Sequence, residues 1–251
     1  MASFSERVFP GISKIAHDLV FSNNTWFTDT SIKSFQSSFL LPNRRDLTSS
    51  SHLHLLVHGS KGGKIHPLLH SLVHDLRRYK NRSVSIDALT NKNLDNREII
   101  DSPMFLVPLF LLPGNHVCSD VPSVLTRLQM NGNNIKLFPF LGSFIPWLSL
   151  LDDFISNHSP LEQPALIHHP VSSAISNDFS KSLESFFKIP VLSWSKWNKD
   201  IYNNFRNYQP IPYLLTPNRN VEINYNGVQL KSLLEIKFIY RGLVNILGNL
   251  P

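Results

Sequence analysis

Two histidines, each placed after an apolar run and a glycine-containing turn, have the clearest capacity for chemistry in this sequence. His58 closes the run 53–57, and His116 follows the run 104–112 after Gly114. An imidazole can bind a divalent transition metal, and it can also accept a proton at cellular pH. The pair therefore suggests metal handling or general-base catalysis. The alternative from the same residues is two hydrogen-bonded histidines at strand ends with no role in binding.

The elements expected to position these histidines are parallel strands followed by helices. Apolar residues recur with helical spacing over 64–80, after the first turn. After the second turn, Asp120 is expected to cap a helix that has Pro122 in its first turn and ends near Met130. Because α/β sheets bind ligands outside the carboxyl ends of their strands, His58 and His116 are expected to meet at one edge of a sheet.

Alternating elements continue through the rest of the chain. Further strands are predicted at 83–89, 104–112 and 135–140, with helical segments at 91–100 and 145–155. After a linker over 157–164 the pattern repeats, with strands at 165–169 and 190–194 and helices at 176–187 and 228–247. We therefore predict an α/β fold with two lobes, each a mostly parallel sheet flanked by helices, the second lobe being degenerate. The boundaries are an extension over 1–50, a first lobe over 51–156 and a second over 165–251.

Composition narrows the class of partner and the compartment. The 251 residues are 42% hydrophobic and 17% charged, and the net charge of +6 favours an anionic partner. No run of Lys and Arg interleaved with aromatics is present, so nucleic acid is not the expected partner. A single cysteine excludes an internal disulfide and suits a reducing compartment. The apolar run 103–113 is about half the roughly 20 residues of a spanning helix, and the run 135–151 is interrupted by Lys136, Pro139 and Pro146. We expect a cytoplasmic protein without a membrane partner.

The residues around the two histidines resemble the class II tetrapyrrole chelatases, the sirohydrochlorin cobaltochelatases and ferrochelatases of the CbiX and SirB type. The resemblance is carried by His58-Gly59-Ser60, by the run Pro108-Leu109-Phe110-Leu111 continuing to Gly114-Asn115-His116, by Asp120-Val121-Pro122, and by Leu141-Gly142-Ser143. It covers about 51–155, is thin over 160–251 and is absent over 1–50.

The resemblance implies a two-lobed enzyme that inserts Co²⁺ or Fe²⁺ into sirohydrochlorin without ATP, in siroheme or cobalamin biosynthesis. The divalent metal is then a substrate, held by His58 and His116, which are also the catalytic residues. Ser60, Lys61 and Gly114 are the candidate substrate-binding residues, and the nearby cations Lys64 and Arg127 suit an acidic macrocycle. Family members often carry a glutamate where Thr90 stands, with Asp87 nearby, so a third, carboxylate ligand stays an open question.

Other readings of these residues stay open. The chain could be a non-catalytic tetrapyrrole- or metal-binding protein derived from the chelatases, or an unrelated α/β binding domain. No nucleotide is expected, because the Ser-Lys-Gly-Gly after His58 lacks phosphate-loop spacing. Three further groups each have a functional and a structural interpretation. A stripe of histidines could relay metal or form a solvated helix face, and a thiol could be a soft metal ligand or a buried inert group. Tryptophans could stack on a macrocycle or pack in the core. These are His66, His70 and His74, then Cys118, then Trp147, Trp194 and Trp197.

Overall fold

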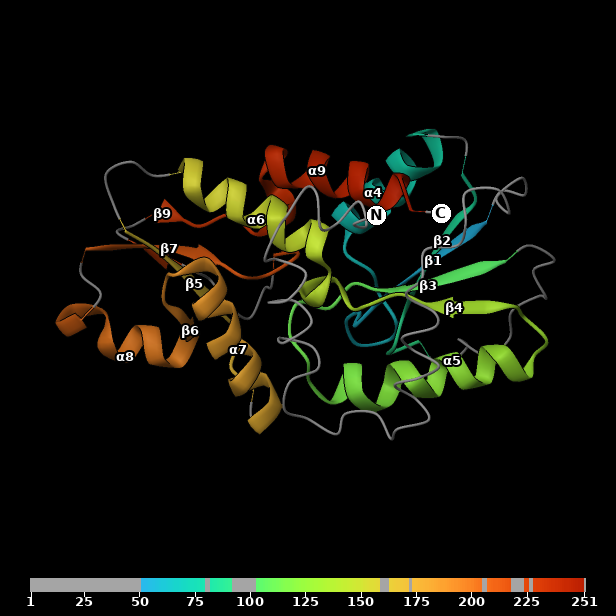
Figure 1. The fold of residues 1–251 in the computed structure, drawn as a ribbon, viewed down its shortest axis with the longest axis horizontal. Coiled ribbons are helices and arrows are strands. Elements are labelled where there is room, and N and C mark those ends of the chain that lie inside the picture. Colours follow the sequence, from blue (N-terminus) through green and yellow to red (C-terminus); the bar gives the residue numbers. More distant parts are fainter. Residues whose placement is uncertain are drawn as a thin grey trace, which may run out of the picture.

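The first lobe is built on a four-stranded parallel sheet in the order β2-β1-β3-β4 (Figure 1). Its strands are β1 (His52–Val57), β2 (Val84–Ala88), β3 (Met104–Pro108) and β4 (Ile135–Leu137). β1 and β3 are buried along their whole length, as expected for parallel strands covered on both faces.

The computed structural model describes residues 51–79, 82–91, 103–158, 163–171, 173–204, 207–217, 224–225 and 228–250. The predicted extension over 1–50 and most of the predicted helical segment 91–100 lie outside these residues. Within the described ranges, no helix has both the length and the apolar character needed to cross a membrane.

Helices cover both faces of the first sheet. α4 (Pro67–Tyr79) packs on one face and α5 (Val121–Met130) on the other (Figure 1). The periodicity predicted a helix over 64–80, and α4 begins three residues later, at Pro67. A proline suits this position because the first helical N–H has no intrahelical partner and the fixed φ is already helical. The core side of α4 is formed by Leu69, Leu72, Val73 and Leu76.

The segment that follows β3 leaves the sheet earlier than the sequence suggested. The apolar run predicted a strand to residue 112, but β3 ends at Pro108. Residues 109–115, which we call the strap, then run over the end of the sheet toward His116. The strap is fixed by a 3-10 turn (Leu141–Ser143), where the Gly142 N–H donates to the Phe110 carbonyl at 2.8 Å. A Cβ on Gly142 would lie 1.8 Å from the Leu111 carbonyl oxygen, so only glycine fits there.

The second lobe repeats the first in a smaller form, as predicted. Its parallel sheet has the order β6-β5-β7, so the first strand of each lobe lies between the next two. No strand corresponding to β4 joins it within the described residues. Its elements are β5 (Gln163–His168), α7 (Ala174–Phe187), β6 (Val191–Ser193), α8 (Trp194–Asn204) and β7 (Tyr208–Pro212), followed by the antiparallel pair β8 (Asn224–Tyr225) and β9 (Val228–Gln229).

The last helix is shorter than the apolar spacing predicted. The prediction of a helix over 228–247 was wrong at its start, because α9 spans Lys237–Gly248 and is preceded by a 3-10 turn, Leu233–Glu235. The Glu235 carboxylate accepts hydrogen bonds from the Ser232 N–H at 2.7 Å and from its Oγ at 2.8 Å. This capping box closes the turn, which also pairs with the segment after β7.

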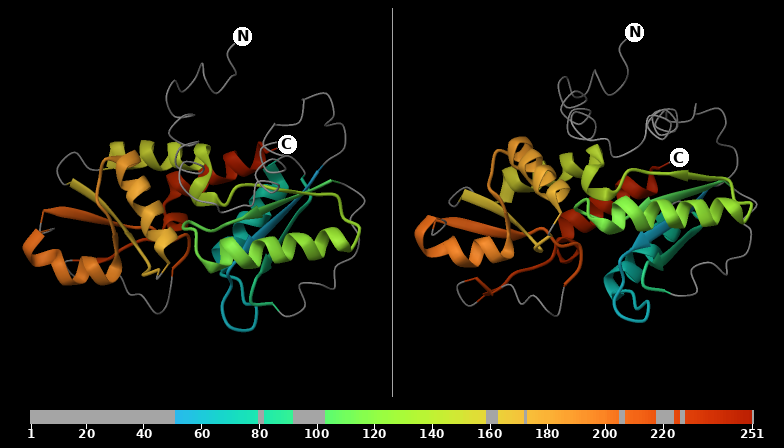
Figure 2. Two further views of the ribbon diagram at one scale, coloured as in Figure 1. Left: turned by 60° about the horizontal axis from the view of Figure 1, so that its bottom comes forward. Right: turned by 90° about the horizontal axis from the view of Figure 1, so that it is seen from below.

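The two lobes share helices at their junction. α6 (Ile145–His158) follows β4 in the chain but lies beside the second sheet, whereas α9 follows the second lobe and packs on α4 of the first (Figures 1 and 2). The Tyr240 hydroxyl on α9 donates to the Asp75 carboxylate at 2.8 Å, and the Tyr79 hydroxyl to Asn245 Oδ1 at 2.7 Å. One hydrophobic core therefore runs through both lobes.

Candidate metal-binding site

The imidazoles of His58 and His116 lie against each other at the carboxyl edge of the first sheet. Their ring centroids are 4.4 Å apart, and the ring planes meet at 65°. His58 directly follows β1, and His116 directly follows the strap. The Phe110 ring lies 6.2 Å from the His116 ring at 26°, which backs the His116 imidazole on one side. The fold thus brings together the two residues that the sequence selected as a pair.

Hydrogen bonds determine which nitrogen of each ring is available to bind a metal. His58 Nδ1 lies 2.6 Å from the Gly59 carbonyl oxygen, and His116 Nδ1 lies 2.6 Å from Asp120 Oδ2. Because a carbonyl and a carboxylate oxygen only accept, Nδ1 carries the proton in both neutral rings. The Nε2 lone pairs are then available, and neither Nε2 hydrogen-bonds to a described residue. Two such nitrogens from adjacent rings are a suitable donor pair for a divalent transition metal.

Asp120 occupies the N-cap position of α5, as predicted, but its side chain does not cap the helix. The Asp120 side chain makes no capping hydrogen bond, and its backbone is helical, because a π-helical turn (His116–Asp120) precedes α5. The carboxylate instead holds His116 Nδ1. An aspartate before Val-Pro is typical of a helix N-cap. The spacing of four residues between His116 and Asp120 could instead have indicated that the two side chains meet on one helical face. A carboxylate on the far nitrogen of a metal-binding histidine fixes its tautomer and orientation.

The turn after His58 is closed by Thr90. The Thr90 hydroxyl donates to the Ser60 carbonyl at 2.8 Å and contacts the His58 carbonyl oxygen at 3.3 Å. Gly59 has a φ of +75°, and a Cβ on it would lie 2.3 Å from the Ala88 Cβ. Thr90 therefore holds the backbone that presents His58. Within the described residues, no group of three or more His, Cys, Asp or Glu side chains could hold one metal ion.

The candidate substrate-binding residues lie on both turns. Ser60 is exposed, and both its N–H and its Oγ donate to the Lys64 carbonyl, at 2.8 and 3.2 Å, so its polar groups close the turn. Lys61 is exposed beside it. Gly114 is half-buried in the strap, and a Cβ on it would lie 3.7 Å from Val171 of the second lobe. Their role in substrate binding stays a prediction.

Other residues singled out from the sequence lie away from the paired imidazoles or serve the fold. Arg127 is in the last turn of α5, at the end far from His116. His66 Nδ1 accepts the Leu68 N–H at 3.2 Å, so this histidine caps α4. The Cys118 thiol is exposed, so its interpretation as a buried inert group is wrong, and desolvation by neighbouring atoms raises its pKa. Two further histidines are exposed on α4 and two tryptophans are fully buried in the core: His70, His74, Trp147 and Trp197.

The second lobe keeps one half of the histidine arrangement. His169 follows β5 as His58 follows β1, and its Nδ1 lies 3.0 Å from the carbonyl oxygen of the next residue, Pro170. The region that corresponds to His116, residues 218–220, lies outside the described residues. The neighbouring His168 is buried, and desolvation lowers its pKa, so it is a neutral core residue near Ser180.

Comparison with known proteins relates this fold to the chelatases. The SirB structure from Bacillus subtilis with Fe3+ matches with a TM-score of 0.52 and 14% identity, over 78% of this chain and 94% of that one. A SirB from B. subtilis subspecies spizizenii in complex with cobalt gives a TM-score of 0.48 at 14% identity, over 78% and 93%. CbiX, described as the terminal enzyme of siroheme biosynthesis in denitrifying bacteria, gives 0.42 at 16%, over 66% and 80%.

No family model and no curated protein sequence matches the chain. At this identity the likeness to SirB establishes the fold and nothing more. The chain therefore has the two-lobed chelatase fold that the sequence predicted, with a smaller second lobe.

Proposed function

We propose that this chain is a sirohydrochlorin-type chelatase, a class II tetrapyrrole chelatase that inserts Co²⁺ or Fe²⁺ into an acidic macrocycle without ATP. The observation that carries the proposal is the contact between the His58 and His116 rings at 4.4 Å, with both Nε2 atoms directed away from their Nδ1 hydrogen bonds. The SirB-like fold supports it independently, because the motif and the fold point to the same family.

The donor set suits transfer of a metal better than permanent binding. Two neutral imidazoles leave most coordination positions of a divalent ion open, whereas a structural site supplies four ligands. The ion can then exchange these ligands for pyrrole nitrogens one at a time. A two-ligand site also lets the ion leave once the macrocycle holds it.

Proton transfer can use the same two rings. Insertion of a divalent ion displaces two pyrrole protons, and each imidazole regains a free Nε2 lone pair as the ion leaves it. His58 and His116 can therefore accept one proton each, and the Asp120 carboxylate stabilises the imidazolium formed at His116. Metal delivery and proton removal then occur at the same two atoms.

A steady-state assay tests this function. Incubation with sirohydrochlorin and Co²⁺ or Fe²⁺ under anaerobic conditions should change the absorption spectrum of the macrocycle faster than the uncatalysed reaction. His58→Ala and His116→Ala should each abolish the acceleration, while His70→Ala, an exposed histidine on α4, should leave it unchanged. Wild-type rates in both site variants would reject the assignment.

A non-catalytic tetrapyrrole- or metal-binding role is the second candidate. Thr90, which holds the His58 turn by hydrogen bonds, stands at the position where a third, carboxylate ligand would lie. Equilibrium binding of sirohydrochlorin or Co²⁺ to the wild-type protein, without any turnover, would favour this candidate over the enzyme.

A further inference from the structure

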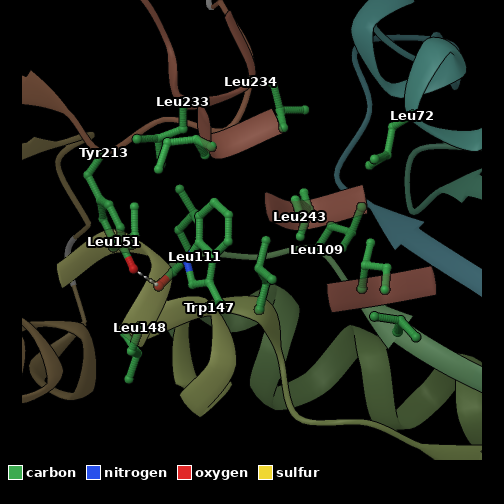
Figure 3. Packing of buried hydrophobic residues seen from close by; sticks show 14 of the residues in the cluster. Leu72, Leu109, Leu111, Trp147, Leu148, Leu151, Tyr213, Leu233, Leu234 and Leu243 are labelled. Carbon is green, nitrogen blue, oxygen red and sulfur yellow. Dashed lines mark hydrogen bonds between the residues drawn. The ribbon is translucent and has the colours of Figure 1, made fainter. Parts of the chain in front are cut away.

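Backbone carbonyls of the strap accept hydrogen bonds from both lobes. The first lobe contributes the Gly142 N–H, which donates to Phe110. The second lobe contributes two side chains: the Tyr213 hydroxyl donates to the Leu111 carbonyl at 3.4 Å (Figure 3), and Ser176 Oγ donates to the Pro113 carbonyl. The segment that leads to His116 is therefore held from the second lobe at two points.

Both second-lobe donors are themselves fixed. Tyr213 directly follows β7 and is 2% exposed, and burial raises the pKa of its phenol, which keeps the proton that it donates. Ser176 lies in the first turn of α7 and is 1% exposed, with its Oγ 2.7 Å from that of the capping Ser173. Neither side chain can rearrange without disturbing a strand end or a helix start.

A backbone hydrogen bond connects the strap to the turn that carries His116. The Gly114 carbonyl accepts the Cys118 N–H at 3.0 Å, which begins the π-helical turn that carries both His116 and Asp120. Gly114 also lies against Val171 of the second lobe. His58, by contrast, is held only by first-lobe residues in the hydrogen bonds described above. The distance between the two imidazoles thus depends on how the lobes are joined.

We propose that the second lobe is part of the metal site, with Ser176 and Tyr213 as positioning residues that set His116 against His58. The proposal rests on the proposed function for the identity of the ligand, a divalent transition metal. The second lobe lacks a complete histidine pair, but in this proposal it sets the geometry of the site.

Ser176→Ala and Tyr213→Phe in the full chain test the proposal, with Ser182→Ala as the control. The Ser182 hydroxyl bonds within α7, to the Asp178 carbonyl at 3.0 Å, and does not reach the strap. Titration with Co²⁺, followed by its visible absorption, should show affinity reduced about tenfold in the first two variants, in the range for residues behind a ligand. The control should match the wild type.

A metal-free measurement separates this proposal from the proposed function. The Hε1 and Hδ2 resonances of His58 and His116 report the ring-to-ring geometry by NMR, whether or not cobalt binds. They should shift in Ser176→Ala and Tyr213→Phe and remain in place in Ser182→Ala. Unchanged resonances in both Ser176→Ala and Tyr213→Phe, in proteins whose melting temperatures show that they are folded, would overturn the role of the second lobe even if the chelatase assay succeeds.

Discussion

The hydrogen bond at Nδ1 of an imidazole determines that Nε2 is the nitrogen that can bind a metal. Asp120 Oδ2 lies 2.6 Å from His116 Nδ1 and accepts a hydrogen bond from it, so the His116 lone pair stays on Nε2. The corresponding partner of His58 is only a backbone carbonyl, that of Gly59. The two rings therefore differ in kind: His116 is supported by a charge, and His58 by the shape of its turn.

Replacement of Asp120 by asparagine should weaken metal binding at His116. An amide oxygen can still accept from Nδ1, but it supplies no charge and the amide can also turn its NH₂ toward the ring. We expect Co²⁺ affinity to fall about 10- to 100-fold, the usual cost of losing a partner behind a metal ligand. Isothermal titration with Co²⁺ measures the change.

The matched control is Asp153→Asn, which removes an exposed carboxylate on α6 without touching either histidine. Its Co²⁺ affinity should equal that of the wild type. If Asp120→Asn binds Co²⁺ as tightly as Asp153→Asn does, the carboxylate does not act through His116.

Among the elements, the strap depends most on one small residue. Gly142 lies under it, and the space for a methyl group is already filled by the Leu111 carbonyl oxygen, 1.8 Å from the ideal Cβ position. A side chain at 142 must push the strap away from the sheet. The contact that anchors Phe110 would be lost with it.

Gly142→Ala should therefore both destabilise the fold and disturb the site. We expect the free energy of unfolding to fall by about 3 kcal/mol, as for overpacking against a fixed backbone. Urea denaturation measures this, and Co²⁺ titration of the folded fraction should show weaker binding. Gly132→Ala is the control, since Gly132 has a φ of +85° but nothing within 4 Å of its Cβ position, and should cost about 1 kcal/mol. Equal losses in both variants would contradict the steric argument.

The sequence predicted the elements in which the local pattern of apolar residues matches the tertiary packing. β1 is buried throughout and α4 carries a regular apolar stripe, so local pattern and tertiary packing agree in both. The pairing of His58 with His116 followed from the same logic, because parallel strands end at one edge. The repeat between the lobes could be recognised because the local patterns of strands and helices recur in the second half of the chain.

The failures occurred where a contact distant in sequence overrides the local pattern. The apolar run after Pro108 looked like more strand, but Leu111 and Leu112 belong to the strap, which is held by Gly142 and by the second lobe. The spacing after residue 228 looked helical, but the 3-10 turn Leu233–Glu235 forms there and its backbone pairs with Leu214 and Leu215 after β7. No local pattern in the sequence indicates that Ser176 reaches the Pro113 carbonyl, since the two are joined only by the fold.

At the scale of the whole molecule, the exchange of helices should couple the unfolding of the two lobes. α9 is contributed by the C-terminal half and packs on α4, while α6 is contributed by the N-terminal half and lies beside the second sheet (Figure 2). Leu243 on α9 is fully buried in the core that includes residues from both sheets (Figure 3). Unfolding of either lobe exposes the helix that the other supplied.

Leu243→Ala should consequently destabilise both lobes together. A cavity at a fully buried leucine costs about 2–5 kcal/mol, and this loss should appear equally in each sheet. Hydrogen exchange followed by mass spectrometry in low denaturant measures it separately for peptides from β1 and from β5. Arg241→Ala, at an exposed position on the same helix, should change neither by more than about 0.5 kcal/mol. Loss of protection in β1 with β5 unaffected would show that the lobes open independently, and the shared core would then not couple them.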